Sequence, residues 1–265
     1  MHSWPLLIFT LAIQAAVGGS LILFLYNAWL KKTVAENTLE KYNLRSLIVL
    51  TALALLGLAC SFFDLGYPLN APNAIRNIGT SWLSREILLT CIFIVLMALA
   101  LVMSLKAKKL TQSLLGVAGL IGLAAVFAMG GLYSNTIFEP WHNVNTLIGF
   151  YGSTFILGTV VINLILFPLY NTNKGSIEAV KLPTLLIILT AFILQFTFIT
   201  AIGFSLTSLN PAISLMRWLC SAFAALLLTY IYFKDTKNSG LIFASFCIML
   251  VGEIIGRYLF YLPLS

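Results

Sequence analysis

The sequence predicts an all-α integral membrane protein with eight transmembrane helices. Of its 265 residues, 60% are hydrophobic and only 9% are charged, whereas about 25% of the residues of an ordinary soluble domain are charged. The mean hydropathy is +1.01. A helix needs roughly 20 apolar residues to cross the hydrocarbon core. The stretches that meet this requirement cover approximately residues 5–30, 46–65, 84–105, 112–133, 144–170, 182–206, 212–233 and 240–263.

The first apolar stretch is expected to remain as a span and not to act as a cleaved signal peptide. The residues before it include no Lys or Arg, the stretch is too long for the apolar region of a signal peptide, and no small-residue cleavage site precedes Lys31. Few residues are left outside the predicted spans. We therefore expect one polytopic membrane domain over residues 1–265, without room for a nucleotide-binding or iron–sulfur domain.

Lysine placement predicts the orientation of the protein in the membrane. Lys and Arg gather in the connections after the odd-numbered spans and are scarce in the others. Cytoplasmic loops of membrane proteins have an excess of Lys and Arg, so both termini are expected on the extracytoplasmic side. This distribution also explains the net charge of +7 without any need for nucleic-acid binding. The cationic residues of these connections are Lys31, Lys32, Lys41, Arg45, Lys106, Lys108, Lys109, Lys174, Lys181, Lys234 and Lys237.

A weak internal repeat suggests how the spans are grouped. The segment FTFITAIGFSLTSLNP, near the end of the sixth span, stands where CSFFDLGYPLNAP stands at the end of the second. A repeated unit with an even number of helices keeps the same topology in both halves. This pattern favours two four-helix bundles.

The segment between the second and third spans is the strongest candidate for a functional site. It covers residues 61–86, SFFDLGYPLNAPNAIRNIGTSWLSRE, with Asp64 near its start and Glu86 at its end. Pro68 and Pro72 exclude a continuous helix, while its Asn and Gly residues favour turns. Placing an ionisable group inside or at the rim of the bilayer costs roughly 2.5–3.5 kcal/mol of insertion free energy. Two carboxylates that flank one loop therefore indicate a site, unless both simply reach water at the membrane surface.

Four other polar residues remain open between a structural and a functional interpretation. Glu253 and Arg257 lie at i,i+4 in the eighth span, so they share a helix face and are expected either to form an internal pair that stabilises the protein or to belong to a proton path. Arg217, in the seventh span, must find a partner on another helix. His142, in an outer loop, is either solvated or able to relay protons, since histidine titrates near neutral pH.

The types of residue that are rare in this protein exclude several kinds of chemistry. Only His2 and His142 are available as histidine ligands, which excludes the bis-histidine haem of a membrane cytochrome b. The four cysteines stand singly in apolar segments, without the C-x-x-C spacing of a zinc or iron–sulfur site. We expect no metal site, no haem and no soluble-enzyme motif.

Two motifs resemble the membrane anchor subunit (DmsC family) of bacterial dimethyl sulfoxide reductase. They are FFDLGYPLNAPNAIRNIGTSWLSREIL, from residue 62, and GEIIGRYLFY, from residue 252. The resemblance implies a multi-pass subunit of the bacterial inner membrane that works beside a molybdopterin catalytic subunit and a subunit with four [4Fe–4S] clusters. Such a haem-free anchor oxidises menaquinol and passes the electrons to the iron–sulfur subunit in anaerobic respiration.

The resemblance also implies which residues oxidise quinol. Glu86 matches the family's carboxylate at the start of the third span, whereas Asp64 stands where the family commonly has a histidine before Leu-Gly. Quinol oxidation needs a base to accept each hydroxyl proton, so Glu86 and Asp64 are the expected catalytic residues. The quinone headgroup is expected near the outer rim of the second and third spans, at Asp64, Gly66, Pro68, Asn73, Arg76 and Glu86.

The partner subunits are expected on the extracytoplasmic face, over residues 65–83 and 134–143. These segments contain Trp82, Phe138 and Trp141, and aromatic residues are typical of interface cores. Two alternatives remain from the sequence. One is an anchor of the same fold for a polysulfide or thiosulfate-type reductase, and the other is a transporter that uses Asp64, Glu86, Glu253 and Arg257 as a proton path.

Overall fold

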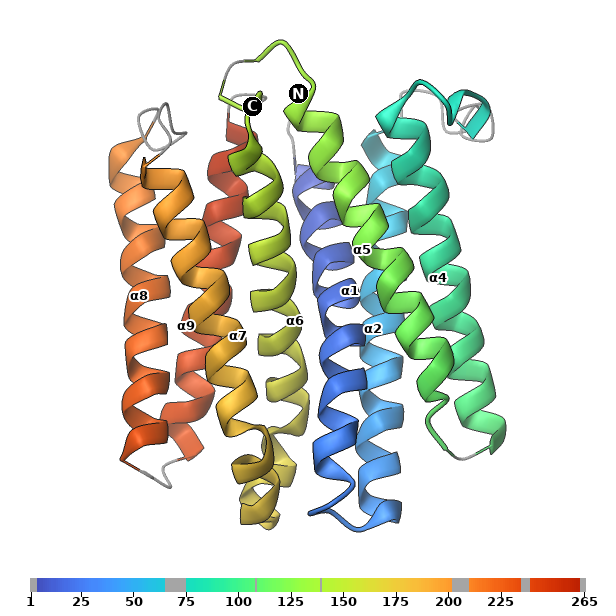
Figure 1. The fold of residues 1–265 in the computed structure, drawn as a ribbon, viewed down its shortest axis with the longest axis vertical. Coiled ribbons are helices and arrows are strands. Elements are labelled where there is room, and N and C mark those ends of the chain that lie inside the picture. Colours follow the sequence, from blue (N-terminus) through green and yellow to red (C-terminus); the bar gives the residue numbers. More distant parts are fainter. Residues whose placement is uncertain are drawn as a thin grey trace.

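The structure is a computed structural model that describes residues 4–64, 75–107, 109–138, 140–201, 210–234 and 239–262. Across these ranges the chain is helical apart from its turns and short connections (Figure 1). Eight helices are long and apolar enough to cross a membrane, as predicted. They are α1 (Trp4–Leu30), α2 (Glu36–Asp64), α4 (Trp82–Ala107), α5 (Gln112–Ser134), α6 (Val144–Thr172), α7 (Lys174–Ala201), α8 (Pro211–Phe233) and α9 (Ser239–Tyr261), with a short 3₁₀ helix, η2, at Ile75–Asn77.

The helices stand side by side, and α1 begins at the same end of the molecule at which α9 ends (Figure 1). We call this the upper end. α1, α4, α6 and α8 end at the opposite, lower end (Figure 1). Two helices begin earlier than the apolar pattern predicts, α2 at Glu36 and α7 at Lys174, because polar helical turns extend each helix past its apolar segment.

The neighbours of each helix are defined by the packing of the bundle. α1 contacts α2 and α5, and α4 contacts α2 and α5. In the same way α6 contacts α7 and α9, while α8 contacts α7 and α9. The extensive contact of α1 with α6 joins the two sets of helices at the centre of the molecule (Figure 1).

Two glycines allow α1 and α6 to approach closely. A Cβ atom on Gly18 would collide with the carbonyl oxygen of Thr154, and a Cβ atom on Gly158 would collide with the backbone of Gly18. Small residues at a helix contact let the backbones approach in a membrane, where association depends on close packing. Gly18 and Gly158 are therefore packing residues at the contact of α1 with α6.

The helix ends are defined by local hydrogen bonds. The Asn143 side chain accepts a bond of 2.8 Å from the backbone N–H of Asn145 and caps α6. Asn210 caps α8 in the same way, with Pro211 as the first helical residue. Both are favoured N-terminal residue types. At the lower end the Glu40 carboxylate accepts a bond of 2.7 Å from the N–H of Leu110, which connects the start of α2 to the segment after α4.

Large apolar side chains cover the outer surfaces of the helices. Leu120 is 64% exposed and Leu226 is 69% exposed, although both lie well inside their helices. In a soluble protein such surfaces would cause association. Here they face outward over the length of the spans, as contact with lipid tails requires.

Candidate functional site

Glu86 lies in the second turn of α4, close to the upper end, and its side chain is buried, with 6% exposed. Its Oε2 atom has no hydrogen-bond partner among the described residues. One helical turn deeper, the hydroxyl of Thr90 is also buried and has no hydrogen-bond partner among the residues that the structure describes. A buried polar atom that the protein leaves unpaired costs roughly 1–3 kcal/mol, so this position indicates a site for water or a ligand.

Two tyrosines lie within electrostatic range of Glu86. The hydroxyl of Tyr261, the last residue of α9, donates to the hydroxyl of Tyr133, on α5, across 3.1 Å. Both hydroxyls are close enough to Glu86 for its charge to act on them. Glu86, Thr90, Tyr133 and Tyr261 form what we call the Glu86 cluster, which gathers titratable groups from α4, α5 and α9.

Arg257 extends this polar region toward the centre of the molecule. Its Nη2 atom donates to Oε1 of Gln14, on α1, across 2.6 Å, and the Gln14 amide in turn donates to the carbonyl of Phe150 across 3.2 Å. The guanidinium carbon lies 4.1 Å from the centroid of the Phe150 ring and 5.6 Å from that of Phe260. A buried arginine is thus held by an amide and two aromatic faces, which are favourable surroundings for a guanidinium.

The aromatic residues above the cluster belong to the protein core. The indole of Trp141 is 5% exposed, donates to the carbonyl of Phe260 across 3.2 Å and meets the Tyr133 ring edge-on, with centroids 5.1 Å apart. The expectation that Trp141 belongs to a partner interface is therefore wrong. In contrast, Ile137 and Phe138 are exposed at the upper end. Trp82 packs on Phe127, with ring centroids 5.7 Å apart.

The two arginines near the start of α4 do not pair with Glu86. Arg85 donates from Nε to the carbonyl of Ile78 across 2.8 Å and from Nη2 to that of Gly79 across 2.7 Å, and its guanidinium lies over the Trp82 ring. Arg76 is exposed. Arg85 therefore fixes the connection before α4, and neither cation forms an ion pair with the carboxylate in the part of the protein described here.

The structure places the other predicted site residues as follows. Asp64 is the last residue of α2, and its side chain lies outside the described residues, as do Gly66, Pro68 and Asn73. His142 is exposed on the connection before α6. How close Asp64, Gly66, Pro68 and Asn73 lie to Glu86 therefore stays a matter of prediction.

The expected internal pair of Glu253 with Arg257 is not formed. Both side chains are buried, but Arg257 turns to Gln14, and neither carboxylate oxygen of Glu253 has a hydrogen-bond partner among the described residues. Arg217 finds its partner on another helix, as predicted, because its Nη2 atom donates to Oε1 of Gln195, on α7, across 2.9 Å. The side-chain amide Nε2 atom of Gln195 in turn donates to the carbonyl of Gly149 and the hydroxyl of Ser153 across 3.4 Å each.

Sequence reasoning missed the uncharged members of these networks. Gln14 and Gln195 are amides surrounded by apolar residues in their helices, and Tyr133 and Tyr261 stand at helix ends, where tyrosine is common at a membrane surface. For the two glutamines the signal was available, since an amide deep in a span needs a partner. For the tyrosines no pattern in the sequence distinguishes a surface anchor from a buried hydroxyl.

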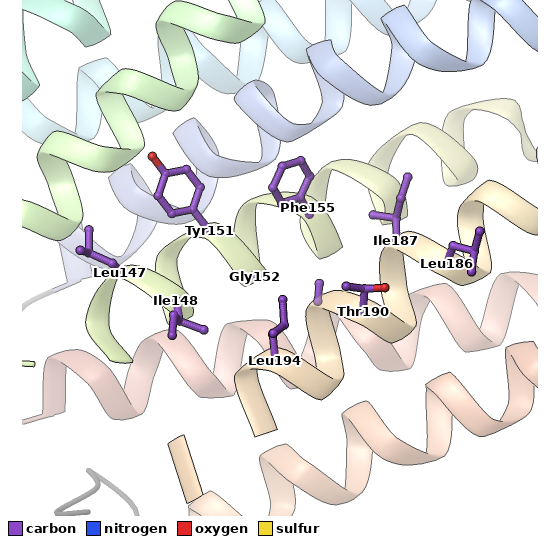
Figure 2. A pocket seen from close by; sticks show the side chains of 10 residues that line it. Leu147, Ile148, Tyr151, Gly152, Phe155, Leu186, Ile187, Thr190 and Leu194 are labelled. Carbon is purple, nitrogen blue, oxygen red and sulfur yellow. The ribbon is translucent and has the colours of Figure 1, made fainter. Parts of the chain in front are cut away.

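A groove of about 470 Å³ runs between α6 and α7 (Figure 2). Its lining is almost entirely apolar, and the hydroxyl of Tyr151 is already bonded to the carbonyl of Leu123 across 3.1 Å. The described residues that line it include no carboxylate or histidine to accept a proton, so they do not indicate quinol chemistry. The lining residues are Leu147, Ile148, Tyr151, Gly152, Phe155, Leu186, Ile187, Thr190, Ala191 and Leu194.

Comparison with known proteins identifies the family. The model of the DMSO reductase anchor subunit (DmsC) family matches residues 1–262. The protein is 29% identical to the C subunit of the anaerobic dimethyl sulfoxide reductase of Haemophilus influenzae, over 98% of its own length and 94% of the relative. Over the same shares it is 28% identical to the YnfH subunit and 27% identical to the C subunit of the Escherichia coli anaerobic dimethyl sulfoxide reductases. The protein therefore belongs to the DMSO reductase anchor subunit family and is a multi-pass protein of the bacterial inner membrane.

Proposed function

We propose that this protein is the haem-free membrane anchor of a dimethyl sulfoxide reductase-type molybdenum oxidoreductase, and that it oxidises menaquinol. Family membership and the names of its relatives support an anchor that works with catalytic and iron–sulfur subunits. The molybdopterin and the [4Fe–4S] clusters, four in number by the resemblance, belong to those partners. The anchor itself supplies the quinol site and the membrane attachment.

The observation that supports quinol oxidation most strongly is the buried carboxylate of Glu86. Oxidation of a quinol to a quinone releases two electrons and two protons, so a base must stand within hydrogen-bond reach of a hydroxyl. Glu86 lies near the upper end, and one of its oxygens has no hydrogen-bond partner among the described residues. Two tyrosine hydroxyls lie within electrostatic range of it. We assign proton acceptance to Glu86 and orientation of the headgroup to the hydroxyls of Tyr133 and Tyr261.

The remaining site residues follow from the sequence. Asp64 is proposed as the second proton acceptor, in place of the family's histidine, and Gly66, Pro68, Asn73 and Arg76 as the wall of the quinone site. The end of α2 and the start of α4 lie at the same end of the molecule (Figure 1), which is compatible with a site between them. His142 is exposed and is assigned no part in the reaction.

We further propose the orientation and grouping that the sequence predicts. α1, α4 and α8 end at the lower end (Figure 1), and lysines follow each of them in the sequence. This favours a cytoplasmic lower end, extracytoplasmic termini and partner subunits docked on the upper end. The contacts that link α1, α2, α4 and α5 in one ring and α6, α7, α8 and α9 in another support two four-helix bundles.

The proposal is tested by the route of electrons in the purified complex. Menaquinol or a short-chain analogue should reduce the clusters of the partner subunit only when this anchor is present. Electron paramagnetic resonance of the clusters measures this reduction. A reduced dye should reach the same clusters with or without it. Equal reduction by quinol in a complex that lacks the anchor would contradict the proposal. The identity of the co-purifying catalytic subunit separates dimethyl sulfoxide reduction from polysulfide or thiosulfate reduction.

A further inference from the structure

A second set of buried polar atoms lies on the side of α8 that packs against α7 and α9, away from Glu86. On α8, the Ser214 and Ser221 hydroxyls, Nε of Arg217 and the indole N–H of Trp218 have no hydrogen-bond partner among the described residues. On α9, both carboxylate oxygens of Glu253 are likewise buried without a hydrogen-bond partner in the described part of the chain. We call Ser214, Arg217, Trp218, Ser221 and Glu253 the polar stripe.

The spacing of these residues places them along one side of α8. Positions 214, 217, 218 and 221 follow the i, i+3, i+4, i+7 pattern of a single helix face. Ser214, Trp218 and Ser221 are buried, with 9% of the surface or less exposed. They cover the upper part of α8, from its first turn to about 15 Å below its start.

Two glycines bring α9 against this face. A Cβ atom on Gly252 would lie 2.5 Å from the Ser221 hydroxyl, and one on Gly256 would collide with the Arg217 guanidinium. Glu253 follows Gly252 directly, and its charge acts on both Arg217 and Arg257. The glycines of the GEIIGR motif thus leave room for polar groups between the two helices.

The polar stripe ends abruptly toward the lower end. The next inward positions of α8 are Ala225 and Leu228, which pack with Phe246 and Met249 of α9 in an apolar cluster. The polar atoms therefore continue toward the upper end but not through the whole membrane.

We infer that water occupies the polar stripe, and that it forms a one-sided proton route between Glu253 and the upper end of the molecule. The donors of Ser214, Trp218 and Ser221, with the acceptor oxygens of Glu253, are the partners that ordered water requires. On this route the Glu253 carboxylate takes a proton from a hydronium or a neighbouring donor, and the O–H bond formed then breaks as the proton passes to the next water. Because the apolar cluster closes the lower end, the route releases protons upward and does not carry them across the membrane.

The use of this route for quinol protons rests on the proposed function, whereas the presence of water does not. Arg257 lies between Glu253 and Tyr261, a member of the Glu86 cluster, in the order of α9, and the charge of Arg257 acts on Tyr261. α9 therefore connects the polar stripe to the groups that we assign to quinol oxidation. We expect it to supply the exit for protons from that site.

Cysteine accessibility tests the presence of water in the assembled complex. In a background in which Cys60, Cys91, Cys220 and Cys247 are replaced, Ser221→Cys should react with a small, water-soluble methanethiosulfonate at least tenfold faster than Ala225→Cys. The two positions are one turn apart on the same buried face, which makes Ala225→Cys a matched control. Equal protection of both thiols would overturn the inference and leave the role of Glu86 untouched.

A second measurement tests proton transfer. Glu253→Gln should lower quinol-driven turnover about tenfold, while dye-driven turnover is kept, and Glu253→Asp should restore most of the loss. Turnover equal to the parent in Glu253→Gln would overturn the proton role of Glu253. If Glu253→Gln fails to assemble, Ser221→Val replaces it. This variant fills the polar stripe with an apolar group and should slow quinol-driven turnover with Glu253 intact, whereas parental turnover would overturn the route.

Discussion

Arg257 of α9 donates a hydrogen bond of 2.6 Å to Gln14 of α1, and this bond joins the first and last helices of the protein. The guanidinium is buried and has no carboxylate within ion-pair distance among the described residues, so the amide oxygen is its main polar partner. A buried charge that loses its partner costs several kcal/mol.

Replacement of Gln14 should therefore destabilise the protein. Gln14→Leu removes the acceptor and leaves the Arg257 charge uncompensated, with an expected loss of about 1.5–3 kcal/mol. Gln14→Glu, which keeps the acceptor and adds a countercharge, should unfold at a temperature close to that of the parent. Thermal unfolding in mild detergent measures both. If the two variants unfold at the same temperature, the bond to Arg257 does not contribute to stability.

The contact of α1 with α6 predicts a contrast between two glycines of α6. Gly158→Ala places a methyl group against the backbone of Gly18 and should destabilise the protein by roughly 1–3 kcal/mol, as overpacking does. Gly149 has nothing within 4 Å of a Cβ position, so Gly149→Ala should be neutral or stabilising by up to about 1 kcal/mol. The same unfolding assay compares them, and an equal effect of both substitutions would refute the close approach of the helices.

The proposed docking face predicts an effect of Ile137. This side chain is fully exposed on the connection between α5 and α6 at the upper end. Ile137→Asp should weaken recovery of the partner subunits in mild detergent, because a charge in an interface core is unfavourable. Glu36→Ala, at the lower end, removes only an exposed ion pair with Lys109 and should leave recovery unchanged. The opposite pattern would place the partners on the lysine-rich face.

The histidine count predicts the absorbance of the purified complex. With only His2 and His142 in the sequence, no pair of facing helices can supply two axial histidines. A reduced-minus-oxidised spectrum should therefore show no b-type bands from this subunit. Bands that disappear with His142→Ala would show that an outer-loop histidine binds haem.

Much of the fold was predictable because the membrane imposes a strong pattern on the sequence. Length and apolarity predicted every described span, and Glu86 stood out as a carboxylate at the start of one. Of the two interpretations of Glu253 and Arg257, the internal pair is not formed, since i,i+4 spacing places two residues on one face but does not decide which helix approaches that face. Gln14 competes for Arg257 from α1, and nothing in the sequence around residue 257 indicates the contact.

The assignment of the proton acceptor is tested most directly by quinol-driven turnover of Glu86→Gln. This variant keeps the size and hydrogen bonding of Glu86 but cannot accept a proton, so turnover with quinol should fall on the order of 10²-fold, a usual loss for a general base. Dye-driven turnover and assembly should remain as in the parent. Asp64→His, which restores the commoner family residue, should keep quinol turnover and move its pH dependence toward that of histidine, near pH 6.5 as a rough value. Parental quinol turnover in both Glu86→Gln and Asp64→Asn would contradict the assignment and place the proton acceptor elsewhere.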